Sequence, residues 1–188
     1  TSDITDDEKT IIEKYLSDGG KVYLILGDTT SDTPNLDGIM SDYGLKKVSG
    51  YIADTQRCYQ GNYYAIFPQL SLSGDLGSGI SNQMVLLLNS PGMEKTDTDN
   101  DNLTVTPFMQ TSDSGYAVTE NDQTQGQYIL GAVSTNAISA DSSDSDSEDE
   151  DDKSDATDTD TKTARLTVLA SASMISSDIT DQLTTLDN

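Results

Sequence analysis

Histidine and tryptophan are absent from this sequence of 188 residues, and cysteine occurs once. Without histidine the chain cannot form a Ser-His-Asp or Cys-His catalytic site, and the usual zinc ligand sets are lost as well. A single cysteine cannot form a disulfide within the chain, so Cys58 does not distinguish an oxidising from a reducing compartment. Most hydrolase mechanisms therefore lose their usual base.

Positive charge is also scarce, because 10 basic residues face 33 acidic ones and leave a net charge of -23. A chain with this charge repels nucleic-acid phosphates and anionic lipid head groups. We therefore expect no nucleic-acid partner.

Long apolar runs are missing too, and none approaches the roughly 20 residues that a membrane-spanning helix requires. The chain begins at Thr1 without methionine and stops at Asn188 within a helical pattern. We expect it to be a fragment of a longer protein, so the lack of a targeting signal carries little information.

The first 45 residues predict a helix, a strand and a second helix. A capping box at Thr5–Glu8 starts the first helix, and Gly19-Gly20 ends it. The apolar run Val22–Leu26 is typical of a strand with both faces covered. A polar loop then leads to Pro34, which begins a second helix that Gly44 closes. This order favours a mainly parallel sheet with helices on both faces.

From Leu45 onward the pattern changes to short strands separated by segments rich in turn-forming residues. The expected strands are Lys46–Ser49, Tyr63–Phe67, Met84–Asn89, Leu103–Met109, Tyr128–Val133 and Arg165–Ala170.

Residues 141–163 form an acidic low-complexity segment with eleven acidic residues, two lysines and Ala156 as the only apolar residue. Such a segment cannot bury enough surface to offset the cost of ordering its backbone, on the order of 1 to 2 kcal/mol per residue. We interpret it as a surface insertion between two strands of a single domain that spans residues 1–188.

Three aspartates at alternate positions, Asp97, Asp99 and Asp101, resemble the beginning of a calcium-binding loop. The expected glycine at the sixth position is Asn102, and the expected glutamate at the twelfth is Phe108. A solvated turn is therefore favoured over a metal site. The clustered Tyr59, Tyr63 and Tyr64 are compatible with a recognition surface, although packing explains most tyrosines.

Several segments resemble, in order, those of the GldG-type auxiliary components of ABC transporters. Asp3–Val22 resembles the family's run "DLT..E...L..YL..GGK", and Leu36–Gly44 resembles its "LN.LL..YGI" helix. Gly61–Pro68, Val105–Ser112 and Ala164–Leu169 resemble its later strands. The resemblance covers most of the chain outside the acidic segment.

The resemblance implies a Rossmann-like α/β domain on the extracytoplasmic face of the cell membrane, anchored by transmembrane helices outside this fragment. It implies no enzymatic activity and no cofactor, and it implies the permease and ATPase subunits of an ABC-type system as partners. In the family a strand normally precedes the position of Asp3. Because its absence would expose a sheet edge, we also expect a homodimer through that edge.

Open α/β sheets place ligands at the carboxyl ends of their strands. We therefore expect the binding surface in two loops, formed by Asp28, Thr29, Thr30 and Asp32 and by Thr111, Ser112, Asp113 and Tyr116.

Two alternatives remain. The first is a solute-binding domain that takes sugars or cations directly, in a cleft lined by tyrosines and carboxylates. The second is a degenerate hydrolase, which would need a buried carboxylate pair or an activated Cys58.

Overall fold

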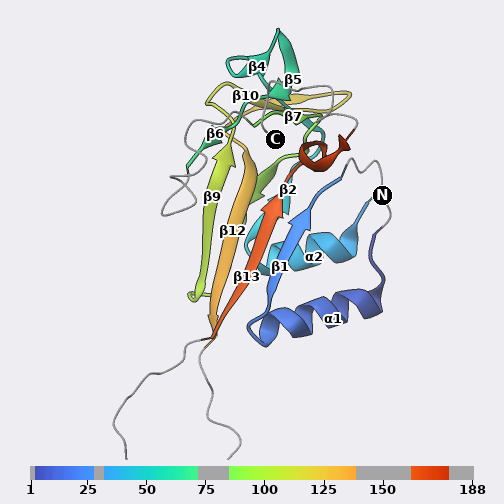
Figure 1. Cartoon of the computed structure of the whole chain (residues 1–188), viewed down its shortest axis with the longest axis vertical. Coiled ribbons are helices and arrows are strands. Elements are labelled where there is room, and N and C mark those ends of the chain that lie inside the picture. The colour runs from blue at the N-terminus through green and yellow to red at the C-terminus, as the bar shows by residue number, and fades with distance from the viewer. Residues whose placement is uncertain (1–2, 28–31, 72–84, 139–161, 178–188) are drawn as a thin grey trace, which may run out of the picture.

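A computed structural model describes residues 3–27, 32–71, 85–138 and 162–177 (Figure 1). Its helices are α1 (Asp6–Ser17), α2 (Pro34–Asp42) and the short 3-10 helix η1 (Ala172–Ile175). Its strands are β1 (Lys21–Ile25), β2 (Leu45–Lys47), β3 (Tyr51–Asp54), β4 (Cys58–Tyr59), β5 (Asn62–Ile66), β6 (Gln69–Leu70), β7 (Leu87–Leu88), β8 (Met93–Lys95), β9 (Leu103–Gln110), β10 (Gly115–Val118), β11 (Gln123–Gln125), β12 (Ile129–Ile138) and β13 (Lys162–Leu169).

Helix α1 begins at the predicted capping box. The backbone N–H of Glu8 donates to the Thr5 hydroxyl, and the Glu8 carboxylate accepts the Thr5 N–H at 2.8 Å. The chain then leaves the helix through Gly19, whose φ of +88° lies in the left-handed region. The apolar residues of this helix are only partly covered, because Leu16 is buried whereas Ile11 is 67% exposed.

The main sheet has seven strands and is mixed. Strand β1 pairs in parallel with β13, and β13 pairs antiparallel with the long strand β12. On its other side β12 pairs antiparallel with β9 and, at Ile129, with β8. Strands β6 and β2 complete the sheet beside β9 and β8. The β1–β13 pair is the only parallel pair among the described strands.

The predicted Rossmann-like α/β fold, with a mainly parallel sheet and helices on both faces, is therefore wrong. The described residues hold thirteen strands but only two α-helices, and nearly all strand pairs are antiparallel. The predicted helix–strand–helix order of the first 45 residues was correct, but the parallel sheet that it suggested does not extend to the strands that follow. The strands after Leu45 follow one another with short connections, and such connections can join antiparallel neighbours but not parallel ones.

One face of the main sheet is open. In Figure 1 no helix lies in front of β9, β12, β13 and β1, whereas α1 and α2 lie to the side of β1 and behind it. On this face Val133 and Thr167 are half-buried and Tyr23 is 60% exposed, whereas Leu169, near the end of β13, is buried. Antiparallel sheets tolerate such one-sided covering well, because alternate side chains separate an apolar from a polar face.

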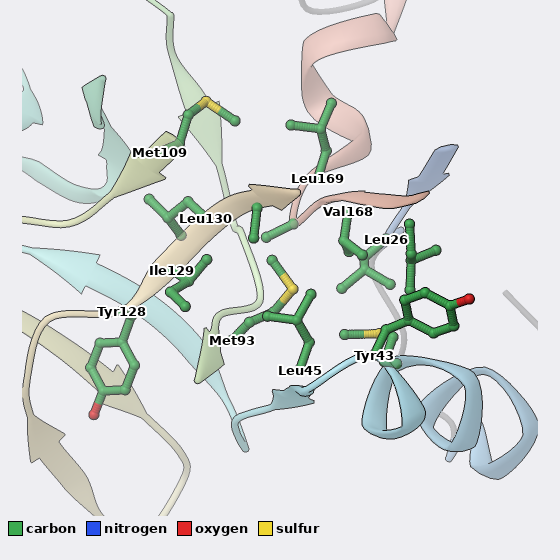
Figure 2. Packing of buried hydrophobic residues seen from close by; sticks show 14 of the residues in the cluster. Leu26, Tyr43, Leu45, Met93, Met109, Tyr128, Ile129, Leu130, Val168 and Leu169 are labelled. Carbon is green, nitrogen blue, oxygen red and sulfur yellow. The ribbon is translucent and has the colours of Figure 1, made fainter. Parts of the chain in front are cut away.

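The core lies on the covered face. Every second residue in the middle of β13 has a fully buried side chain, namely Ala164, Leu166 and Val168. Figure 2 shows Leu45 and Met93, from β2 and β8, beside Val168, with Tyr43 at the end of α2 next to Leu26. Leu45, Met93 and Val168 are all 0% exposed. Burial of this apolar surface is the main source of stability.

Two three-stranded antiparallel sheets lie at one end of the main sheet, at the top of Figure 1. One has the order β11-β10-β3 and the other the order β4-β5-β7. The predicted strands near residues 45, 63, 84, 103, 128 and 165 all correspond to strands in the structure, with shifted bounds. The short strands β3, β4, β6, β8, β10 and β11 were not predicted.

The predicted acidic insertion at 141–163 falls between β12 and β13. Residues 141–161 lie outside the described residues. Lys162 and Thr163 belong to β13, where they pair with Ile138 and Ala137. The second strand therefore begins at Lys162, three residues before the predicted start at Arg165.

Candidate functional site

The first predicted binding loop leads from β1 to α2. Asp28, Thr29 and Thr30 lie outside the described residues, and Asp32 is exposed. Thr33, which follows, is buried, and its hydroxyl donates to Asp37 and accepts a hydrogen bond from Lys47. Lys47 also forms an ion pair with Asp37 at 2.8 Å. The described part of this loop is therefore bonded to its own helix and to β2.

The amino end of α2 is capped by another part of the chain. Thr33 makes no side-chain cap, and instead the Asp3 carboxylate accepts the N–H groups of Asn35 and Leu36 at 2.7 and 3.2 Å. Burial by itself raises the pKa of Asp3, but these hydrogen bonds outweigh it and hold the pKa below its ordinary value. The positive end of this helix is thus occupied by an internal carboxylate.

The second predicted loop has a structural role at its start. Ser112 donates to the buried Asp54 carboxylate through its N–H, at 2.7 Å, and through its hydroxyl, at 2.8 Å. The N–H groups of Gln56 and Arg57 donate to the same carboxylate, both at 2.9 Å. Burial alone would raise the pKa of Asp54, but the four hydrogen bonds lower it below its ordinary value.

The remaining residues of that loop are divided between the interior and the surface. Thr111 is buried, and its hydroxyl accepts the N–H of Tyr128 at 2.9 Å. Asp113 is exposed, and Tyr116 is half-buried within β10. Across the described ranges no hydrogen bond joins Asp32 to any of these residues. Thr111 and Ser112 hold the β10–β11 hairpin to β3 and β12.

The three alternating aspartates lie in the turn between β8 and β9. There the Thr98 hydroxyl accepts the N–H of Asn100, and the Asn100 side chain accepts the N–H of Asn102. Side chains of the intervening residues thus stabilise the turn itself. No group of three potential metal ligands occurs among the residues that the structure describes. The structure accordingly has an exposed turn at Asp97, Asp99 and Asp101.

A pocket of about 300 Å³, which we call the serine pocket, opens at the carboxyl ends of β1 and β13. The described residues lining it include Gly27, Leu88, Asn89, Ser171, Ala172 and Ser173, and none of them is ionisable. The two serine hydroxyls lie 2.7 Å apart. Ser171 donates to the Leu88 carbonyl and Ser173 accepts the Leu88 N–H, so both hydroxyls fix η1 to β7.

A larger pocket of about 550 Å³, the tyrosine pocket, lies between the two small sheets. Its described lining includes Gly50, Tyr51, Tyr64, Asn89, Val118 and Glu120. Tyr51 begins β3, Val118 ends β10 and pairs with Tyr51, and Tyr64 lies in β5. The pocket therefore combines two aromatic rings with one amide and one carboxylate.

Asn89 lines both pockets and was missed by the sequence analysis. Its φ of +46° lies in the left-handed region, which asparagine tolerates better than most residues. Its N–H donates to the Tyr64 carbonyl at 3.0 Å, which leaves its exposed side chain at the junction of the pockets. Asn89-Ser90-Pro91 is a turn signal that could have identified this position.

Comparisons with known proteins support the fold alone. No known family matches the chain, and no curated protein matches it. Among solved structures, a chain described as "mmIFT52 N-terminal domain" is similar, with a TM-score of 0.58 and 13% identity. The match covers 96% of this chain and 66% of that chain. The chain thus shares an overall fold with that domain, at an identity too low to indicate a common function.

No helix in the described ranges has both the length and the apolar character of a membrane-spanning segment.

Proposed function

We propose that this chain is a non-catalytic binding domain with its main recognition site at the serine pocket. The observation that carries the proposal is the position of this pocket, at the carboxyl ends of the parallel strands β1 and β13. Its described lining offers no acid, base or free nucleophile, because the hydroxyls of Ser171 and Ser173 are already bonded to each other and to Leu88. Such a surface can hold a segment of a partner without acting on it chemically.

The proposed setting is an ABC-type transport system, in which the domain would be an accessory component on the extracytoplasmic face. This part rests on the resemblance of Asp3–Val22 and Leu36–Gly44 to the GldG-type components. The permease and ATPase subunits of the same system are the proposed partners.

Co-purification of the full-length protein in mild detergent, followed by mass spectrometry, tests this proposal. We expect a permease and an ATPase in stoichiometric amounts with the unaltered protein. Replacing Ala172, which lines the serine pocket, with phenylalanine fills the pocket and should reduce their recovery at least about fivefold. Thr106→Phe, on the exposed side of β9, is the matched control. Recovery of the protein alone, or equal loss with both variants, would contradict the proposal.

The edge of β1 supports the proposed homodimer. Gly20 accepts the Arg165 N–H and Leu26 donates to Leu169, so the even-numbered residues of this segment face β13. The N–H and C=O groups of Lys21, Tyr23 and Ile25 therefore point to the opposite side, where no described strand pairs with β1. Free backbone groups of this kind can pair with the same edge of a second copy.

Analytical ultracentrifugation of Tyr23→Pro tests the edge pairing. Proline removes an outward N–H without removing a bond to β13, so the variant should stay folded and become monomeric. Glu94→Gln, on the exposed part of β8, is a control that leaves the edge unchanged. A protein that is monomeric before any substitution would refute the dimer.

A second candidate function is direct binding of a small ligand, and the tyrosine pocket favours it. A cleft lined by tyrosines and a carboxylate is what this alternative requires, and Tyr51, Tyr64 and Glu120 meet in one pocket. Its volume is typical of small-molecule sites.

A further inference from the structure

We propose that the tyrosine pocket binds an organic cation, with an ammonium or methylated ammonium group between the tyrosine rings and the Glu120 carboxylate. This inference rests on the second candidate function and names the chemical class of its ligand. It follows from the shape, the charge and the bonding state of the residues that line the pocket.

The shape is set by three strands from two different sheets. Tyr51 and Val118 are partners in the β3–β10 ladder, and Tyr64 lies across from them in β5. Gly50 allows the chain to turn beside the pocket, with a φ of +85° and no room for a side chain next to the Val118 backbone. The walls are thus regular strands and a tight turn, which hold the two rings in place before a ligand arrives.

The charge of the lining selects for cations. Glu120 is exposed and forms no ion pair within the described part of the chain, and no basic residue is among the described lining residues. The faces of tyrosine rings carry negative electrostatic potential and attract ammonium groups. A net charge of -23 over the whole chain adds a long-range attraction for cations and opposes anions.

The two pockets differ in how many of their side chains are already hydrogen-bonded within the chain. The hydroxyls of Ser171 and Ser173 are already hydrogen-bonded within the chain. By contrast, no hydrogen bond within the described ranges involves the side chains of Asn89, Tyr64 or Glu120. For Tyr51 the inference uses only the ring, which lines the pocket. The two pockets share the Asn89 side chain, and the tyrosine pocket adds the Tyr64 hydroxyl and the Glu120 carboxylate as acceptors for a ligand.

Calorimetric titration of the full chain with choline tests the proposal, because choline is a small methylated ammonium. The control ligand is 3,3-dimethylbutan-1-ol, which has nearly the same shape without the charge. We expect choline to bind at one site and the neutral alcohol to bind at least about tenfold more weakly. Equal affinity for the two ligands, or no saturable binding of choline, would overturn the proposal. Glucose provides a third titration, and preferential binding of the sugar would also reject an organic cation.

Matched variants locate the site. Tyr64→Leu keeps an apolar side chain but removes the ring, and should weaken choline binding about tenfold. Glu120→Gln should weaken it about threefold and reduce its dependence on salt, because an exposed charge is screened. Tyr63→Leu is the control, since Tyr63 is the neighbouring residue of β5, is 50% exposed and does not line the pocket. Equal effects of the Tyr63 and Tyr64 substitutions would place the site elsewhere.

These outcomes are distinct from those of the co-purification experiment. If choline fails to bind while permease and ATPase are recovered, only the cation site is rejected. If choline binds and no subunits are recovered, the accessory-domain proposal is the one that fails.

Discussion

The main sheet and the two small sheets are held together by different interactions. In the main sheet, Leu166 and Val168 of β13 are fully buried against apolar neighbours from α1, α2 and β2. The β3–β10–β11 sheet contributes Ile52 and Ala117 to the same apolar cluster, but it also contains a buried carboxylate, because Asp54 is 0% exposed and accepts four hydrogen bonds. Apolar packing is non-directional, whereas hydrogen bonds fix the angle between the groups that they join.

Both pockets lie next to the small sheets. Both contain Asn89, which follows β7 and whose N–H donates to Tyr64 of β5 in the same small sheet. Sheets of three short strands cannot bury a large core of their own, so directional bonds such as those of Asp54 and Ser112 hold their positions. The tyrosine pocket lies between the two small sheets, whereas the serine pocket lies where β7 meets the carboxyl ends of β1 and β13.

The largest expected effect comes from the apolar core. Leu166→Ala creates a cavity under the helices and should lower the free energy of unfolding by about 3 kcal/mol. Urea unfolding followed by circular dichroism measures this change. Thr106→Ala, on the exposed side of β9, should change it by less than about 0.5 kcal/mol. If both variants lose the same stability, the covered face is not the core.

Asp54→Ala should lower the free energy of unfolding by less than Leu166→Ala does, and its effect should be concentrated in β3 and β10. The substitution leaves the N–H groups of Gln56, Arg57 and Ser112 without their acceptor, which should cost about 2 kcal/mol. Hydrogen exchange should speed up in β3 and β10 before it changes in β12 and β13. Asp113→Ala, in the same loop but exposed, is the matched control. Equal acceleration of hydrogen exchange in all four strands would contradict the proposal that Asp54 stabilises mainly the small sheet.

Acidification should remove the stabilising contribution of the Asp54 carboxylate. The pKa of Asp54 is lower in the folded than in the unfolded chain, where it is about 4. Its contribution is therefore complete above the unfolded-state pKa and is lost as the pH falls through the folded-state pKa. Unfolding free energies measured from neutral pH down to about pH 3 should fall more steeply for the unaltered chain than for Asp54→Asn. Parallel curves would show that Asp54 does not contribute to the pH dependence.

The smallest effect is expected at the cap of α2. Asp3→Ala removes the acceptor for the Asn35 and Leu36 N–H groups and should accelerate exchange of these two amides, with little change elsewhere. Asp101→Ala, an exposed aspartate in the β8–β9 turn, serves as the comparison. Unchanged exchange in the first turn of α2 would show that Asp3 is not its cap.

The sequence predicted the order and limits of the elements in the first 45 residues well, because the signals there are local. The prediction that both faces of the strand at Val22–Leu26 are covered was wrong, since β1 is an edge strand and Tyr23 is 60% exposed. The capping box at Thr5 and Glu8, the glycine at Gly19 and the proline at Pro34 each act within one turn of the chain. The later strands were located but not their partners. An apolar run such as Leu103–Met109 is compatible with either strand direction, so parallel pairing was assumed where the structure has antiparallel ladders.

The candidate site was less accessible to prediction than the fold. Thr111 and Ser112 were expected in a binding loop because they follow the carboxyl end of a strand, but both are buried by contacts with residues far away in the chain. Asn89 was passed over because nothing in its neighbours indicates that Tyr51, Tyr64 and Glu120 lie nearby. Residues 72 to 84 and 139 to 161, where the sequence predicts turns and an acidic insertion, lie outside the described residues.

The sequence by itself determined the helix boundaries, the acidic character of the chain and the absence of histidine-based chemistry, because each depends on residue identity or on neighbours within one turn. Tertiary structure alone decided the directions of the strands, the open face of the main sheet and the meeting of Tyr51, Tyr64 and Glu120 in one pocket. These features depend on contacts between residues far apart in the chain, and such contacts are favoured only when the whole fold buries its apolar surface.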